Sequence, residues 1–297
     1  MRKTSGNTLC LIFAVVDDFC KHLKKRKRRG GPKPKISRNQ IIKMMTLKFL
    51  LGITSDRSLI RFLNNFGDGL FRKVPDHSWF NRRSKELLPT FELFREYLLK
   101  QLQVENDPIR IIDSTPVPVV RYVRGFGPLA KSFERASFGY CATQEEKYFG
   151  FKLHLLTTRT GIPTHFDITE ARLHDVKMLE ELVSSYDKLI AIGDKGYHDF
   201  KLKDKLLAER KLVVTPDKKN QKRHKNTQTE KYFLKFRKRI EITINQLKDQ
   251  FNLAKLRAKS TLGLITRIMG IMMTLTLAIV VNRLLGRSDF KIKELLL

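Results

Sequence analysis

Periodic apolar positions predict several short helices in the first hundred residues of the chain. Ser37 can cap a helix that runs to about Leu51, and Asp56 can cap another. A longer helix is expected from Ser78 through Leu99. Short helices with basic faces suit a compact DNA-binding module of helix-turn-helix style, and a helical domain that merely packs on the rest of the chain is the alternative.

After Asp107 and Pro108 the pattern changes from helices to strands. The expected elements, in order, are a strand at 109–113, a hairpin of 148–158 and 163–169, a helix at 175–184, a strand at 189–192, a helix ending near 207 and a strand at 212–215. Pro116 and Pro118 should limit how far the first strand continues as a central strand. Strands joined by helical crossovers pair in parallel and a hairpin pairs antiparallel, so we predict an α/β fold with a mixed sheet flanked by helices.

The remainder of the chain is basic at first and apolar later. Residues 217–239 carry ten Lys or Arg and only two acids, which indicates a mobile loop that leads into a basic helix. The uncharged run at 268–282 has 15 residues, whereas a membrane-spanning helix needs about 20, so a buried core helix is expected. We therefore predict an all-helical domain over 1–107, an α/β domain over 108–287 and a tail over 288–297.

The charge of the chain narrows the choice of partner. The 59 Lys and Arg against 30 Asp and Glu give a net charge of +29, which calls for a polyanion. Nucleic acid is the leading candidate, and a membrane surface is the rival. The apolar run at 9–16 is followed by Asp17 and Asp18 without a small-residue cleavage site, which argues against secretion. A cytoplasmic protein without a membrane partner is expected, with reduced thiols at Cys10, Cys20 and Cys141.

Three acids are candidates for chemistry. Asp113 and Asp194 each end an apolar run, where a strand delivers a carboxylate to the rim of a sheet. On the helix predicted over 237–248, the offsets of Arg237, Glu241 and Lys248 place these residues within about 40° of one another. Singly, each acid has a structural explanation as a turn cap, a helix cap or one arm of a helical ion pair. Together, in a chain of this charge, they favour a common site.

A carboxylate set of this kind suits phosphodiester chemistry. Cleavage needs an activated nucleophile and a stabilised leaving oxygen, and two Mg²⁺ ions about 3.5–4 Å apart provide both. Mg²⁺ prefers oxygen ligands and is held by one or two carboxylates together with waters and phosphate oxygens. Arg237 and Lys248 would grip phosphates beside the ions, because a carboxylate cluster alone repels DNA.

Four segments carry a family resemblance: IIDSTPVPV, EEKYFGFKLHLLTTRTGIP, IAIGDKGYHD and RKRIEITINQLK. They resemble the catalytic domain of bacterial insertion-sequence DDE transposases, in the RNase H-like integrase superfamily. The similarity extends from about Asp107 to Arg287, and PDHSWFNRRSKEL in the amino-terminal half looks similar too. A helical signature of that group spaces Tyr, Arg, Glu and Lys by two, three and six residues. Arg237, Glu241 and Lys248 match it, whereas Leu234 stands where Tyr is expected.

The resemblance implies an RNase H-like fold in which Asp113, Asp194 and Glu241 are the catalytic and metal-binding acids. The implied cofactor is a pair of Mg²⁺ ions, with Mn²⁺ as the alternative. The implied activity is cleavage of double-stranded DNA at the terminal inverted repeats of an insertion sequence, followed by joining of the 3′ ends to target DNA. Because two ends are handled at once, at least a homodimer is expected on DNA, in the nucleoid of a bacterial cytoplasm.

Further DNA contacts are expected near these acids. Lys195 and Tyr197 follow Asp194 closely, and they either touch the scissile strand or only close a turn. Between the first strand and the hairpin, basic residues alternate with aromatic residues in a loop. This loop would either follow a phosphate backbone, or form a surface flap with its aromatic rings turned inward. The basic residues of this loop that are predicted to contact DNA are Arg121, Arg124 and Lys131. We expect structural roles for His154, His165 and His174, since hard cations favour oxygen.

Two other functions remain open from the sequence. A metal-dependent nuclease of the same fold would cut DNA without joining it. A catalytically inactive remnant of a mobile element would bind DNA without cutting. The nuclease would lack the strand-transfer activity of a transposase, and the inactive remnant would lack DNA cleavage as well.

Overall fold

A computed structural model describes residues 3–23, 35–141, 145–217 and 226–295 of the chain, with side chains from Thr8 onward. The chain forms two compact units, of which the first combines residues 1–102 with 250–297 and the second comprises residues 103–249. The first is helical and the second contains the sheet. The expected domain limits at 107 and 287 differ from these units mainly at the carboxyl end, where 250–297 cluster with the amino-terminal helices.

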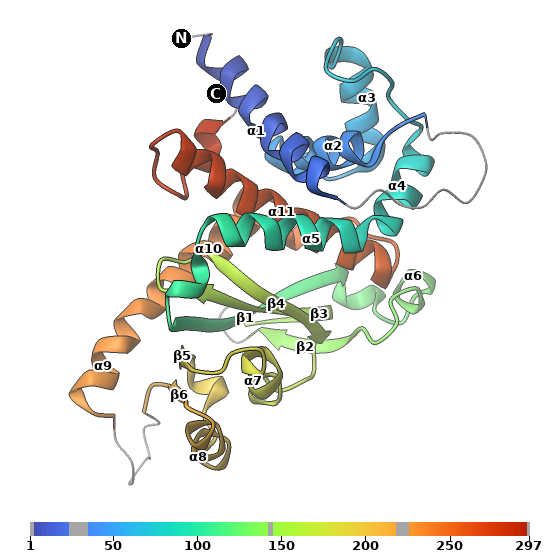
Figure 1. The fold of residues 1–297 in the computed structure, drawn as a ribbon. Coiled ribbons are helices and arrows are strands. Elements are labelled where there is room, and N and C mark those ends of the chain that lie inside the picture. Colours follow the sequence, from blue (N-terminus) through green and yellow to red (C-terminus); the bar gives the residue numbers. More distant parts are fainter. Residues whose placement is uncertain (1–2, 24–34, 142–144, 218–225, 296–297) are drawn as a thin grey trace. The chain divides into compact units, whose positions relative to one another are not determined.

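The helical unit is built around α11 (Thr261–Leu284), which contacts helices that precede the sheet in sequence (Figure 1). It contacts α1 (Lys3–His22), α2 (Arg38–Leu50), α4 (His77–Glu86) and α5 (Leu88–Gln101), whereas α3 (Asp56–Phe66) contacts α4. Short 3₁₀ turns, η5 (Leu253–Lys255) and η6 (Ile292–Leu295), flank α11 in sequence. By length and composition α11 is apolar enough to cross a membrane, but 89% of its apolar window is buried inside the protein. The expectation of a buried core helix is confirmed.

Two helix boundaries of this unit bear out or correct the predictions. Ser37 caps α2 through a capping box, in which the Gln40 backbone N–H donates to the Ser37 hydroxyl at 3.2 Å and the Ser37 N–H donates to the Gln40 side chain at 3.1 Å. Ser55, not Asp56, caps α3, because the Ser58 N–H donates to the Ser55 hydroxyl at 3.0 Å. The Asp56 carboxylate instead lies among buried cations.

The single long helix expected over 78–99 is two helices. α4 ends at Glu86, and α5 begins at Leu88 with Pro89 in its first turn. Proline has no backbone N–H, and its ring clashes with the carbonyl of the preceding turn, so a helix entering from α4 cannot pass through Pro89.

The second unit carries a six-stranded mixed sheet. Its strands are β1 (Ile109–Val120), β2 (Ser137–Cys141), β3 (Glu146–Thr158), β4 (Pro163–Glu170), β5 (Leu189–Ile192) and β6 (Lys211–Val214). The order is β2-β3-β1-β5-β6, with β2 and β4 both pairing antiparallel to β3. The β3–β4 hairpin turns at 159–162, β5 pairs parallel to both β1 and β6, and β1 pairs antiparallel to β3. β2 was not predicted, because it lies in the segment interpreted as a basic and aromatic loop.

β1 continues through both of its prolines. It pairs with β3 from Arg110 to Val120, but with β5 only over Ile109–Ile111. The strand is therefore central only before Asp113, and Pro116 and Pro118 lie where one side of β1 has no strand partner. The prolines limit the central part of β1 as expected, but not its length.

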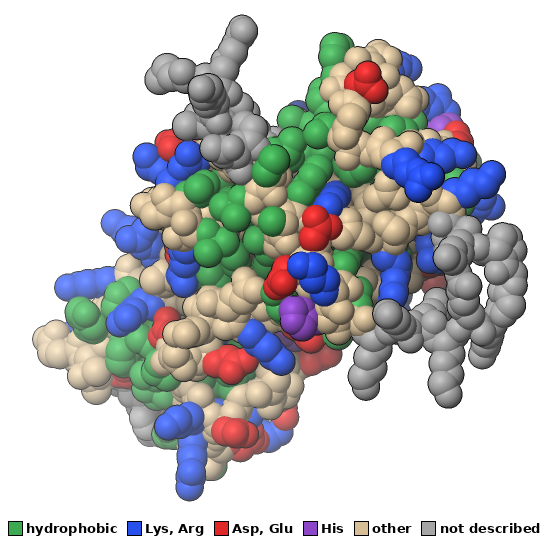
Figure 2. All heavy atoms as spheres, turned by 45° about the horizontal axis from the view of Figure 1, so that its top comes forward, with side chains coloured by type: hydrophobic (Ala, Val, Ile, Leu, Met, Phe, Trp, Pro, Cys, Tyr) green, Lys and Arg blue, Asp and Glu red, His purple; other side chains and the backbone are tan. Residues whose placement is uncertain are grey.

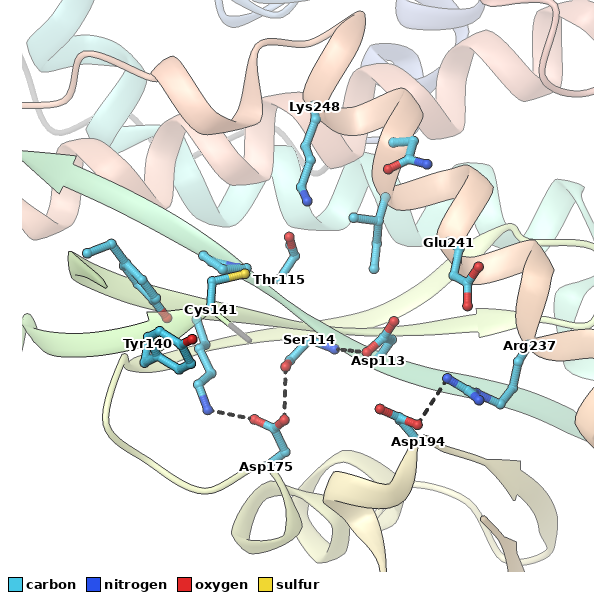
Figure 3. A pocket seen from close by; sticks show the side chains of 15 residues that line it. Asp113, Ser114, Thr115, Tyr140, Cys141, Asp175, Asp194, Arg237, Glu241 and Lys248 are labelled. Atoms are coloured by element: carbon cyan, nitrogen blue, oxygen red, sulfur yellow. Dashed lines mark hydrogen bonds and ion pairs between the residues drawn. The ribbon is translucent and has the colours of Figure 1, made fainter. Parts of the chain in front are cut away.

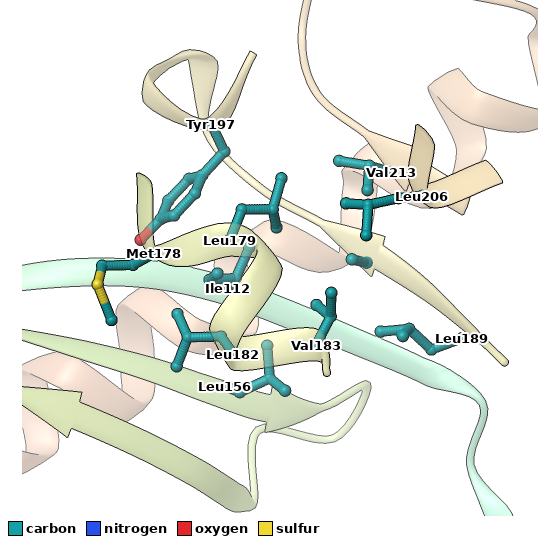
Figure 4. Close-up of a cluster of buried hydrophobic side chains, with 11 residues drawn as sticks. Ile112, Leu156, Met178, Leu179, Leu182, Val183, Leu189, Tyr197, Leu206 and Val213 are labelled. Atoms are coloured by element: carbon teal, nitrogen blue, oxygen red, sulfur yellow. The ribbon is translucent and has the colours of Figure 1, made fainter. Parts of the chain in front are cut away.

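Helices cover the sheet of the second unit. They are α6 (Pro128–Lys131), α7 (Val176–Val183), α8 (Phe200–Ala208), α9 (Gln228–Leu234) and α10 (Lys238–Asp249), with 3₁₀ turns η1 (Val104–Asn106), η2 (Tyr122–Arg124), η3 (Lys195–Tyr197) and η4 (Lys235–Arg237). Leu179 and Leu182 of α7 pack against Ile112 of β1 and Leu156 of β3 in a cluster with an exposure of at most 5% (Figure 4). This mixed sheet between helices is the expected RNase H-like fold. The loop expected within 217–239 falls largely on 218–225, outside the described residues.

Candidate active site

The pairing of β1 with β5 brings two acids to the same edge of the sheet. The parallel register places Ile111 opposite Ile192, and Asp113 and Asp194 each follow two residues later. Gly193 allows a close approach at this point, because a Cβ there would lie 3.0 Å from the Ile112 side chain. The two strands therefore deliver their carboxylates side by side, as expected for the carboxyl ends of neighbouring parallel strands.

The third acid comes from α10. Ile240, Ile244 and Leu247 are buried, and the Thr243 hydroxyl donates to the Gly161 carbonyl in the β3–β4 turn at 2.8 Å. These contacts hold α10 against the sheet, where it contacts β1. Glu241 stands on the same stripe of α10 as Ile244, Asn245 and Lys248, at helical spacing, and all four line one pocket with Asp113 and Asp194.

The pocket encloses about 640 Å³ and is predominantly polar. The carboxylates of Asp113, Asp194 and Glu241 point into the same space, and Lys248 reaches toward it from two turns farther along α10 (Figure 3). Arg237, in the 3₁₀ turn before α10, forms an ion pair with Asp194 at 3.1 Å. Three carboxylates and two cations that are remote in sequence therefore share one hollow.

Asp113 is a partly buried acid of this pocket. The pKa of its carboxyl is raised from 3.8 to about 6. Burial is the main cause, the Ser114 backbone N–H lowers the pKa, and the nearby Asp194 carboxylate raises it. This N–H donates to the Asp113 carboxylate at 2.8 Å. The ionised form of Asp113 is therefore unfavourable in the metal-free protein, and a cation bound in the pocket would stabilise that form.

The raised pKa predicts how stability depends on pH in the metal-free protein. A carboxyl that binds its proton more tightly in the folded state stabilises the fold below about pH 4, and this contribution is lost as the pH rises through about 6. The change from 3.8 to about 6 corresponds to at most about 3 kcal/mol. In excess chelator, the Asp113→Asn variant should have a higher melting temperature than the parent protein at pH 8 and the same melting temperature at pH 4. Equal melting at both pH values would contradict the burial of this charge, and Asp187→Asn is the exposed control.

Asp175 is a member of the pocket that the sequence did not single out. Its carboxylate accepts a hydrogen bond from the Ser114 hydroxyl at 3.1 Å and pairs with Lys152 at 2.8 Å. The Lys152 ammonium also donates to the Leu173 carbonyl at 2.7 Å, so it is held by two acceptors. Asp175 was interpreted only as the start of a helix. Its one sequence signal, an acid just before an apolar helical run, is shared with ordinary caps.

Other predicted DNA contacts lie outside the pocket lining. Lys195 is exposed directly after Asp194. The Tyr197 side chain is 1% exposed, packs in the core of this unit and contacts His154 through its hydroxyl at 3.3 Å, so we withdraw it as a DNA contact. The side chains of Arg121, Arg124 and Lys131 are exposed.

The segment between β1 and β2 divides its aromatic rings between core and surface. Phe133 is 3% exposed, whereas Phe126 is 84% and Tyr140 is 58% exposed. Phe138, in β2, contacts Phe126 and Phe149 with ring centroids 4.9 Å apart in each pair. Neither of the two expected arrangements, all rings outward or all inward, describes the segment.

His154 is a buried core residue. It is 0% exposed and lies 2.9 Å from the Thr169 hydroxyl, and burial lowers its pKa to about 4. The neutral ring is therefore satisfied by hydroxyl partners, which confirms the structural role expected for this histidine.

The comparison with known protein families agrees with this geometry. The family described as "Transposase DDE domain" matches residues 105–277, which is more than half of the 297-residue chain. The chain belongs to the DDE transposases. The matched segment covers the sheet unit and continues into α11 of the helical unit. Neither the curated proteins nor the solved structures give a match to the transposase.

Divalent metal ions are typical of DDE transposases, and the donors in this pocket are of the right kind. Asp113, Asp194 and Glu241 supply only carboxylate oxygens, the ligands that Mg²⁺ prefers. Within the described residues, no three acidic, His or Cys side chains are grouped tightly enough to hold one ion. This still fits Mg²⁺, because that ion keeps several waters and takes one or two carboxylates with substrate phosphates supplying the rest.

The transposase also shows what occupies the signature position where Tyr is expected. Leu234 is half-buried at the end of α9, two residues after Tyr232. Tyr232 is 55% exposed and meets Phe236 edge-on, with ring centroids 5.5 Å apart. An aromatic ring is therefore available beside this position, but not in it.

Proposed function

We propose that the transposase cleaves DNA at the inverted-repeat ends of an insertion sequence and joins the freed 3′ hydroxyls to target DNA. The convergence of Asp113, Asp194 and Glu241 on one pocket is the observation that carries this proposal. The net charge of +29 supports a DNA partner, and Lys and Arg side chains spread over the face drawn in Figure 2.

The three acids would hold two Mg²⁺ ions, or Mn²⁺ in their place. When bound, such a pair stabilises charge on the attacking and leaving oxygens of an in-line displacement. The side chains of the protein would position the DNA and neutralise its phosphate charge. Lys248 and Arg237 flank the acids and would bind phosphate oxygens on either side of the scissile bond, so that the carboxylates do not repel the substrate.

Arg237 has to exchange partners for this role. Its guanidinium pairs with Asp194, whose side chain is 50% exposed, so water already screens much of the attraction. A DNA phosphate can therefore replace the carboxylate at modest cost and leave Asp194 free to bind a cation. Lys195, next to Asp194, and the exposed Arg121, Arg124 and Lys131 are proposed as further backbone contacts.

A strand-transfer assay tests the proposed function. Pre-cut ends carrying the element's terminal sequence are incubated with target DNA and Mg²⁺, and joined product is measured. A transposase makes joined product, whereas a nuclease of the same fold releases cut DNA only, and an inactive remnant binds without either reaction. Absence of joining with active cleavage would reduce the proposal to a nuclease.

At least two protomers are expected on DNA, since two element ends must be joined together. Sizing of the complex assembled on end-sequence DNA should give a mass of two or more chains. A single protomer that joins both ends would refute this part of the proposal.

Asp175 is proposed as a positioning residue for the pocket. Asp175→Asn breaks the ion pair with Lys152 and weakens the bond from Ser114, the residue whose N–H orients Asp113. Loss of such a supporting partner typically costs about 10–100-fold in metal affinity or activity. We expect cleavage to need correspondingly more Mg²⁺, with partial rescue by Asp175→Glu. An unchanged Mg²⁺ titration would show that Asp175 only stabilises the fold.

A further inference from the structure

A second hollow lies wholly within the helical unit, beside α4. It is lined by Lys35, Lys73, Trp79, Arg82 and Arg83, among others, and we call it the Trp79 hollow. It encloses about 620 Å³, within the range of roughly 300–1,000 Å³ that is typical of ligand sites. Ile36 and Pro75, both buried, contribute apolar wall to it.

The charge of the Trp79 hollow is positive once internal pairs are counted. Two acids also line it, but Glu86 is paired with Arg83 at 2.5 Å. The Asp76 carboxylate caps α4, accepting from the Ser78 N–H at 2.8 Å, and contacts His77 at 3.1 Å. No ion pair within the described residues engages the other three cations, which are exposed, namely Lys35, Lys73 and Arg82. Their charge is available to an anionic ligand.

Trp79 gives the hollow an aromatic surface. Its side chain is half-buried, and no other aromatic ring of the described residues stacks on it. Flanked by free cations, an aromatic wall matches the chemistry of a nucleotide in an unpaired strand, whose base offers a π-face and whose phosphates offer charge. A paired duplex presents phosphates but no free base face to a concave site.

We propose that the Trp79 hollow binds one unpaired nucleotide of DNA, with its base against Trp79 and its flanking phosphates on Lys35, Lys73 and Arg82. This inference rests on the proposed function, in which the protein binds DNA ends. It assigns to the helical unit a site for a nucleotide that has left the duplex. Hydrogen bonding to a particular base edge is not required, so the site accepts any base.

Trp79 is the only tryptophan of the chain, so its emission reports on the hollow alone. The full-length protein, in excess chelator so that no DNA is cut, is titrated with a short oligodeoxythymidylate and with a blunt duplex of the same length. We expect the single strand to quench the emission and the duplex to leave it largely unchanged. In parallel, the anisotropy of the labelled oligonucleotide gives the affinity of variants.

Trp79→Ala should weaken binding of the single strand by about tenfold or more. Arg82→Ala should weaken it clearly more than Arg61→Ala, which removes the same charge from an exposed position of α3 in the same unit. Equal quenching by the duplex, no quenching at all, or equal losses for Arg82→Ala and Arg61→Ala would overturn the proposal. Quenching is measured in chelator and strand transfer in Mg²⁺, so the two proposals can fail separately. Quenching without strand transfer would refute the proposed function but support nucleotide binding in the Trp79 hollow. Strand transfer without quenching would support the proposed function but refute nucleotide binding in the Trp79 hollow.

Discussion

Replacing Asp113 by Asn is expected to reduce DNA cleavage by about 10³-fold or more while DNA binding stays within a few-fold of the parent protein. Asn keeps the shape and the hydrogen bond from Ser114 but removes the charge that a cation requires. Metal-assisted charge stabilisation contributes several kcal/mol to such reactions, and about 4 kcal/mol corresponds to about 10³-fold in rate.

Glu241→Gln should behave in the same way, although Glu241 is exposed on α10 and Asp113 is half-buried on β1. Initial rates on a labelled end substrate give the activity, and gel shift in excess chelator gives the binding. Asp187→Asn, an exposed acid of the same unit outside the pocket, is the matched control and should keep full activity. Normal cleavage by either pocket variant would remove the catalytic role of these acids.

The second large effect is expected on stability, at Asp56. Its carboxylate accepts from Asn81 at 2.7 Å and pairs with Lys48 at 2.5 Å and with Arg267 at 3.3 Å. Burial alone would raise its pKa, but Lys48 and Arg267 lower it below the ordinary value. The Lys48 side chain is only 1% exposed, so Asp56 is what makes its charge tolerable inside the unit.

Asp56→Ala should therefore destabilise the protein by about 3–5 kcal/mol, because it leaves a buried cation without its partner. Urea unfolding followed by circular dichroism measures the loss. Lys48→Met combined with Asp56→Ala should recover part of it, since the uncompensated charge is then removed as well. Asp68→Ala, an exposed acid of the same unit, should change stability by no more than about 0.5 kcal/mol. A decrease in the free energy of unfolding as small for Asp56→Ala as for Asp68→Ala would contradict a stabilising role for the ion pairs of Asp56 with Lys48 and Arg267.

Local patterns in the sequence determined most of the elements around the site. Alternating and continuous apolar runs placed β3, β4, β5 and β6 within a few residues of their limits, because side chains alternate across a sheet in any tertiary context. The helical spacing of Arg237, Glu241 and Lys248 put all three on one side of a predicted helix, and all three line the pocket. The length of the uncharged run at 268–282 was enough to recognise a core helix, as α11 is.

Only the tertiary structure decided which segments meet. Whether Asp175 reaches Ser114 and Lys152 depends on how α7 packs on β1 and β3, and nothing in the residues before α7 distinguishes this acid from a helix cap. The extent of β1 depends on β5 being short, which leaves Pro116 and Pro118 without a partner on one side. Tyr197 lies in the core because the turn after β5 points its side chain inward. Periodicity is a property of neighbouring residues, whereas the site and the two compact units are made by contacts between segments remote in the chain.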